Sequence, residues 1–124
     1  MNVVARARRC VGARFRPQGR SIETGLDCVG LALFAWGLRP DAVQRDYRLR
    51  GGDESVLAAE LARFGRPVEL GEAGDIALAR AGPGQPHLAV LVPGGFVHAD
   101  LGSGRVEERP GAPTWPVLSN WRRG

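Results

Sequence analysis

The sequence has 124 residues, 44% of them hydrophobic, and its 17 basic and 13 acidic residues give a net charge of +4. This length predicts a single domain over residues 1–124 with one hydrophobic core, and it excludes a second binding module of ordinary size. All the basic residues are arginine. They are dispersed and not interleaved with aromatic side chains, so the positive charge does not predict a nucleic-acid surface.

Targeting and membrane signals are absent from the sequence. No apolar run approaches the roughly 18 residues of a membrane span. The first nine residues contain several arginines and no apolar segment of the signal-peptide type, so we expect synthesis in the cytoplasm and, for any external substrate, delivery by other machinery.

The two cysteines, Cys10 and Cys28, do not form a CxxC motif. A disulfide between them stays open at this point, and Cys10 is otherwise expected to be a packing residue. A zinc site that combines both cysteines with His87 and His98 would lack the tight spacing of structural sites. We therefore expect no metal and no cofactor.

The first half of the chain is predicted to be helical. A helix is expected over 3–11, followed by a loop over 14–25 that is rich in turn residues. The apolar run 28–36 predicts a buried helix, with Asp27 at its N-cap position and Gly37 just beyond its end. Residues 39–53 are polar and irregular, and apolar spacing predicts an amphipathic helix over 55–64.

The second half has the short, punctuated runs of a β-sheet. Strands are expected over 75–80, 87–92, 96–100 and 105–109, with turns at 92–96 and 102–104. The tail 110–124 is expected to pack on this sheet through Trp115 and Trp121. The order predicts an α+β fold in which the helices pack on an antiparallel sheet.

Cys28 falls in the first turn of the predicted buried helix. A helix N-terminus favours the thiolate, which is the nucleophilic form of cysteine, and its free N–H groups can stabilise an oxyanion. The alternative is a small cysteine that only fills the core.

His87 and His98 are the two histidines of the chain, and both lie in the predicted hairpin. If the turn between the strands has an even number of residues, both imidazoles lie on one face of the sheet. One imidazole would then serve as a general base for Cys28, oriented by a third polar group. The alternative is that each histidine is structural.

Five motifs resemble those of the NlpC-type cell-wall cysteine peptidases. In chain order they are GARFR (12–16), GLDCVGL (25–31), GDIAL (74–78), HLAVLV (87–92) and GFVHA (95–99). The resemblance implies a papain-like fold and hydrolysis of amide bonds in peptidoglycan stem peptides, commonly between D-γ-glutamate and a diamino acid. The small size and the tail rich in Trp and Arg resemble the branch found in phage tails and gene transfer agents, which implies tail proteins as partners and a virion-associated location.

The resemblance also implies residue roles. Cys28 would be the nucleophile and His87 the base, with His98 as the orienting residue. Asp100 shares the strand and parity of His98, so it stays open as an alternative orienting residue. Asp27 would help to recognise the free amine of the substrate. Phe15 replaces a common tyrosine and Val29 a common serine, so two polar contacts to the substrate or the oxyanion are missing.

Other functions stay open. Phe15 and Val29 favour a non-catalytic structural or binding module with the same fold, and a related amidase or acyl-transfer enzyme would use the same Cys–His pair. Asp75, which precedes a strand, is expected to stabilise a turn.

Overall fold

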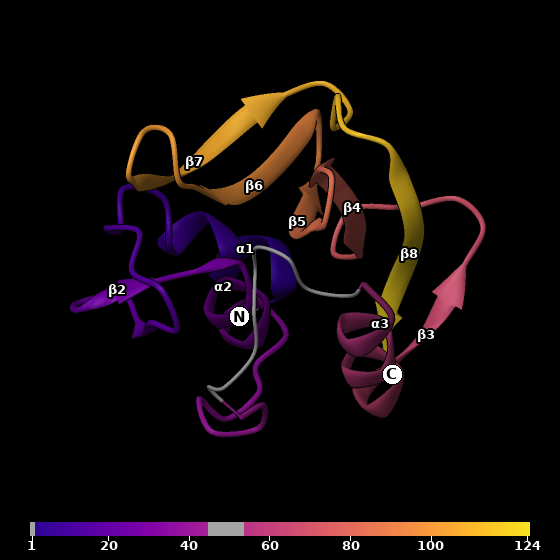
Figure 1. The fold of residues 1–124 in the computed structure, drawn as a ribbon, viewed down its shortest axis with the longest axis horizontal. Coiled ribbons are helices and arrows are strands. Elements are labelled where there is room, and N and C mark those ends of the chain that lie inside the picture. Colours follow the sequence, from indigo (N-terminus) through magenta and orange to yellow (C-terminus); the bar gives the residue numbers. More distant parts are fainter. Residues whose placement is uncertain (1, 45–53) are drawn as a thin grey trace.

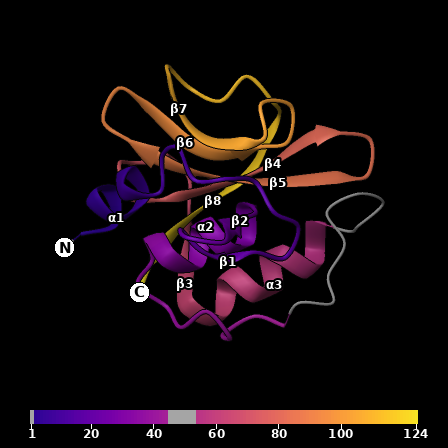
Figure 2. The ribbon, with the colours of Figure 1, turned by 90° about the vertical axis from the view of Figure 1, so that its left-hand side faces the viewer.

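The computed structural model describes residues 2–44 and 54–124. A six-stranded antiparallel sheet forms one layer, and helices α2 and α3 pack below it in the second layer (Figures 1 and 2). This arrangement confirms the predicted α+β fold. Among the described residues, no helix is both long enough and apolar enough to cross a membrane.

Helix α1 (Val3–Arg9) and helix α2 (Cys28–Ala35) are confirmed, each one or two residues shorter than predicted. Asp27 caps α2, because its side chain accepts a hydrogen bond from the Gly30 N–H at 2.9 Å. Gly37 ends the helix with φ +71°, and the N–H groups of Gly37 and Leu38 donate to the carbonyls of Phe34 and Leu33. This pair of bonds is a Schellman motif, for which glycine is favoured at the left-handed position.

Nearly all of α2 is buried, and Phe34 alone of its residues is partly exposed. The helix approaches the preceding loop so closely that a Cβ atom on Gly30 would lie 2.0 Å from the Gly19 carbonyl oxygen. Any larger residue at position 30, two residues after Cys28, would therefore clash with the loop. The loop itself contains a two-stranded ribbon of β1 (Arg20–Ser21) and β2 (Gly25–Leu26).

Helix α3 (Glu54–Phe64) confirms the predicted amphipathic helix, with Leu57 and Leu61 buried. The predicted irregular segment 39–53 lies partly outside the described residues, which resume at 54.

The sheet has the order β3-β8-β4-β5-β6-β7. The four predicted strands correspond to β4 (Ile76–Gly82), β5 (Gln85–Val92), β6 (Gly95–Asp100) and β7 (Arg105–Pro110). The tail was expected to pack on the sheet. It instead contributes a strand to the sheet, β8 (Val117–Arg123). β8 pairs with β4 on one side and on the other with β3 (Gly65–Val68), which the sequence did not reveal as a strand.

The β5–β6 turn has two residues, since Val92 pairs with Gly95. The turn is thus even, and the register Val90–Val97 puts His87 and His98 on the same face of the sheet. Leu88, Val90 and Val92 alternate with His87 and belong to the core that packs against the helices. The two histidines therefore lie on the opposite face from that core.

Candidate active site

A cavity of about 200 Å³ lies where the N-terminus of α2 meets the ends of β5 and β6. Cys28, His87 and His98 all line it, together with Phe15, Asp100 and Trp115. The other lining residues are Ala81, Gln85, Pro86, Ala99 and Leu101. The structure thus brings four of the six residues predicted for the site, Cys28, His87, His98 and Phe15, to one cavity.

The thiol of Cys28 is nearly completely buried, with 1% of the residue exposed. Burial and the neighbouring Asp27 carboxylate raise its pKa from 9.0 to about 12, although the backbone N–H groups of Leu88, Cys28 and Val29 lower it. The N–H groups at the helix N-terminus thus lower the pKa of Cys28, in the expected direction, but burial and Asp27 raise it by more. The loss of hydration outweighs the helix dipole, so the resting group is a neutral thiol.

The N–H of Leu88 that stabilises the Cys28 sulfur belongs to the residue directly after His87. The recorded pairing between β5 and β6 ends at Val90–Val97, before this position. Leu88 still pairs with β4 but lies beyond the last paired residues of β5 and β6, where the thiol can approach its amide. Cys28 belongs to the helical layer and the imidazoles lie on the opposite face of the sheet. The approach of the thiol to this amide explains how they share one cavity.

His87 contacts His98 through Nε2, which lies 3.1 Å from Nδ1 of His98. The Nδ1 atom of His87 is consequently the ring nitrogen left for other partners. Burial and the neighbouring His98 lower the pKa of His87 from 6.5 to about 4, against the effect of Asp100, which raises it. His87 is therefore neutral at physiological pH and can accept a proton.

Two aromatic side chains, Trp115 and Phe96, pack around the imidazole pair. The Trp115 ring lies 4.8 Å from the His87 ring and 5.0 Å from the His98 ring, both at steep angles, and Phe96 contacts His98 and Trp115. The sequence placed Trp115 on the sheet without a role at the site. It could not show that the connection between β7 and β8 returns over the histidines.

Asp27 is fully buried and does not line the cavity. Its carboxylate accepts hydrogen bonds from the N–H groups of Gln18 and Gly30 and forms an ion pair with the buried Arg20, at 3.4 Å. These contacts use the carboxylate inside the protein. No exposed part of Asp27 is left to make the predicted contact with a substrate amine. Asp27 instead holds the loop 18–27 against the start of α2.

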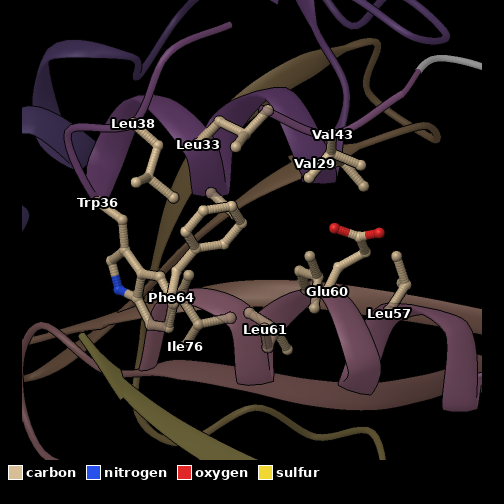
Figure 3. Close-up of a pocket in the computed structure, with 12 residues that line it drawn as sticks. Val29, Leu33, Trp36, Leu38, Val43, Leu57, Glu60, Leu61, Phe64 and Ile76 are labelled. Atoms are coloured by element: carbon tan, nitrogen blue, oxygen red, sulfur yellow. The ribbon is translucent and has the colours of Figure 1, made fainter. Parts of the chain in front are cut away.

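Val29 also lies elsewhere. It points from α2 toward α3, where it lines a separate apolar cavity with Val43, Leu57 and Leu61 (Figure 3). A side chain directed into this space does not face Cys28's cavity, so the expected role of Val29 in substrate binding is wrong.

Neither cysteine forms a disulfide. Cys10 is buried, and its thiol donates a hydrogen bond to the Arg6 carbonyl at 3.5 Å, which supports a packing role. Asp75 is buried as well and accepts two hydrogen bonds from Arg122, each at 3.0 Å, so it links β8 to the start of β4. Both residues lie outside the cavity.

One group of potential metal ligands is found among the described residues. A ring nitrogen of His98 and carboxylate oxygens of Asp100 and Glu107 lie within 4.8 Å of one another. Arg109 already contacts both carboxylates, at 3.4 Å to Asp100 and 2.8 Å to Glu107. One guanidinium thus contacts both carboxylates and offsets part of their charge, and we assign no metal to this group.

No family model matches the sequence, and no curated protein matches it either. Solved structures do match. NlpC2 and NlpC1 of Trichomonas vaginalis superpose on 98% of this chain with TM-scores of 0.71 and 0.69, at 18% and 20% identity. The P60 domain of the M. avium subspecies paratuberculosis antigen MAP1204 covers the same share, with a TM-score of 0.62 and 20% identity.

The chain has the fold of an NlpC/P60 domain. The NlpC/P60 domain of the peptidoglycan hydrolase SagA covers 93% of this chain and 94% of its own, with a TM-score of 0.58 and 24% identity. The P60 domain of the antigen is likewise matched over 90% of its length. By contrast, the chain spans less than half of the two T. vaginalis proteins, 44% and 42%. These likenesses confirm the papain-like α+β architecture predicted from the sequence.

Proposed function

We propose that the protein is a cysteine peptidase that hydrolyses amide bonds in peptidoglycan stem peptides, with Cys28 as nucleophile and His87 as base. The observation that carries the proposal is the shared cavity, in which a thiol at a helix N-terminus meets a hydrogen-bonded pair of neutral imidazoles. A neutral imidazole beside a neutral thiol is a competent acid–base pair, since the proton can pass between them during the reaction.

In the proposed reaction, Nδ1 of His87 takes the thiol proton as the sulfur attacks the carbonyl carbon. The oxyanion is stabilised by the Cys28 backbone N–H at the start of α2. The C–N bond then breaks, His87 gives its proton to the leaving amine, and a thioester remains on Cys28. Water attacks the thioester with His87 as base, which releases the carboxylic acid and restores the thiol.

The substrate class is supported by two observations of different kinds. The motifs around Cys28, His87 and His98 resemble NlpC-type cell-wall peptidases, and a structure with the same fold is named as a peptidoglycan hydrolase. The D-γ-glutamyl–diamino acid bond, synthesis in the cytoplasm and delivery by a phage-like tail are further parts of the proposal. They rest on the sequence, and none of the compared structures bears on them.

Digestion of purified peptidoglycan tests the proposal. We expect the wild type to release peptide fragments, identified by mass spectrometry, and the C28A variant to release none while keeping its circular dichroism spectrum. The matched control is C10A, which removes the other buried thiol and should keep its activity. Equal release by C28A and the wild type would exclude Cys28 as the nucleophile.

A non-catalytic binding module is the second candidate, and the raised pKa of the buried Cys28, about 12, favours it. Phe15 adds to this support because it brings no hydroxyl group to the cavity. This candidate expects the wild type to bind peptidoglycan without releasing fragments. An amidase with a different acyl substrate would instead leave defined muropeptides intact and cleave another γ-glutamyl or lipid amide.

A further inference from the structure

The Nε2 atom of His98 is buried and has no hydrogen-bond partner. The other ring nitrogen, Nδ1, contacts His87. A buried polar atom without a partner is rare and costs free energy, so its surroundings determine whether it carries a proton. For His98 that choice matters, because its two nitrogens cannot both be acceptors in the neutral ring.

The side chains around His98 differ in charge between the β5 side and the β6–β7 side. β5 supplies the neutral His87, whereas Asp100 on β6 and Glu107 on β7 supply carboxylates. Glu107 pairs directly with His98 in the sheet register, and both carboxylates have an oxygen within 4.8 Å of a ring nitrogen of His98. Arg109 bridges the two carboxylates through its Nη2 atom.

We propose that Asp100 and Glu107 are positioning residues that keep the proton of His98 on Nε2. A proton on Nε2 faces a negative environment, whereas a bare lone pair there would be repelled by the carboxylates. Nδ1 of His98 is then the acceptor and Nε2 of His87 must donate to it. This leaves the lone pair of His87 on Nδ1, the nitrogen that a base for Cys28 requires.

Because Arg109 contacts both carboxylates, the position of the His98 proton depends on Asp100 and Glu107 together. With Asp100 and Glu107 neutralised, the guanidinium loses its ionic partners and can donate to Nε2 of His98 instead. The proton of His98 would then move to Nδ1 and that of His87 to its own Nδ1. His87 would present a donor to Cys28 and could no longer accept the thiol proton.

Nitrogen-15 NMR of the two imidazoles tests this inference, because the shifts show which ring nitrogen carries the proton. We expect the Nε2–H form for His98 in the wild type. In the D100N/E107Q variant the ratio of the two tautomers should shift by about tenfold or more toward Nδ1–H. Adding R109L removes the competing donor, so the tautomer ratio should move back from Nδ1–H to a value between those of D100N/E107Q and the wild type.

The control is E108Q, since Glu108 lies next to Glu107 but pairs with Arg8 and takes no part in the cluster. It should leave both tautomers unchanged. The wild-type spectrum alone shows whether His98 is in the Nε2–H form. A poorly folded variant therefore does not weaken this part of the test. An Nδ1–H form of His98 in the wild type, or unchanged tautomers in folded D100N/E107Q, would overturn the inference.

A second measurement links the tautomer to the thiol. In a C10A background, alkylation of Cys28 at pH 7 should be about tenfold slower in D100N/E107Q than in E108Q. The inference rests on the proposed role of His87 as base, but neither measurement requires peptidoglycan. If the tautomers shift as expected and no peptide is cleaved, the proposed function fails alone. If alkylation slows while the tautomers stay fixed, the inference fails alone.

Discussion

Nε2 of His87 and Nδ1 of His98 lie 3.1 Å apart, which joins the two imidazoles through one nitrogen each. The contact orients His87 so that its Nδ1 is available to the cavity that contains Cys28. Two strands supply this pair, and the two-residue turn between them sets its register. The candidate site therefore depends on a hairpin as much as on the helix that presents the thiol.

The raised pKa of Cys28 predicts an unreactive thiol at neutral pH in the absence of substrate. In a C10A variant, the rate of alkylation by iodoacetamide should rise with pH and reach no plateau below pH 9, because the pKa is about 12. The free energy of unfolding should also fall as the pH rises from 9 toward 12, since the folded protein holds the thiol proton more tightly than the unfolded chain. A plateau below pH 7 would instead reveal a thiolate–imidazolium pair.

Trp115 should contribute to the low pKa of His87 by excluding water from the imidazole pair. The W115A variant is expected to raise that pKa from about 4 toward 6.5, as measured by NMR titration. W115F keeps an aromatic ring and is the matched control. An unchanged His87 pKa in W115A would show that burial by the strands, and not by Trp115, lowers this pKa.

The same pKa has a consequence for stability at acid pH. Because the folded pKa of His87 lies below its ordinary value of 6.5, its contribution is complete above pH 6.5 and is lost as the pH falls through about 4. Denaturant titrations should show a smaller loss over this range in W115A than in the wild type. Equal losses would show that other groups govern the acid stability.

Asp27 should be essential for the fold. Replacing it with alanine removes the cap of α2 and leaves the buried Arg20 without this carboxylate, which should cost about 3–5 kcal/mol. Urea denaturation of D27A measures this loss. The control is D41A, which removes an exposed ion pair with Arg39 and should change the free energy of unfolding by less than about 1 kcal/mol. Similar stability of D27A and D41A would contradict the structural role of Asp27.

Phe15 gives a prediction about rate. It lines the cavity but has no hydrogen-bonding group, so F15Y adds a hydroxyl there. If the hydroxyl reaches the oxyanion, peptidoglycan cleavage should increase by about tenfold, below the 10²–10³ that a fully positioned donor provides. A lower rate in F15Y, with unchanged stability, would indicate that the added hydroxyl obstructs the substrate.

Much of the fold could be predicted because local patterns and contacts agree. The apolar run after Asp27 was sufficient to place Cys28. The sequence left the parity of the hairpin turn open, and the structure shows an even turn at Pro93–Gly94 that puts both histidines on one face. β3 and β8 escaped prediction because β3 has only four residues, β8 is largely polar, and both are stabilised by pairing with distant strands.

Errors at the site have one physical origin, which is burial. Residue spacing cannot show that Asp27 is enclosed with Arg20, that Val29 faces α3, or that desolvation outweighs the helix dipole at Cys28. Each depends on which surfaces meet once the layers are assembled.

The position of β8 between β3 and β4 has a consequence for synthesis on the ribosome. The meander from β4 to β7 can form as it emerges, and α3 contacts β4 and β5 directly, but β3 joins the sheet only through β8. Completion of the six-stranded sheet must therefore wait until residues 117–123 have left the exit tunnel. Until then the apolar side of α3 has no completed sheet to cover it, so nascent chains at this stage should be the ones that chaperones engage.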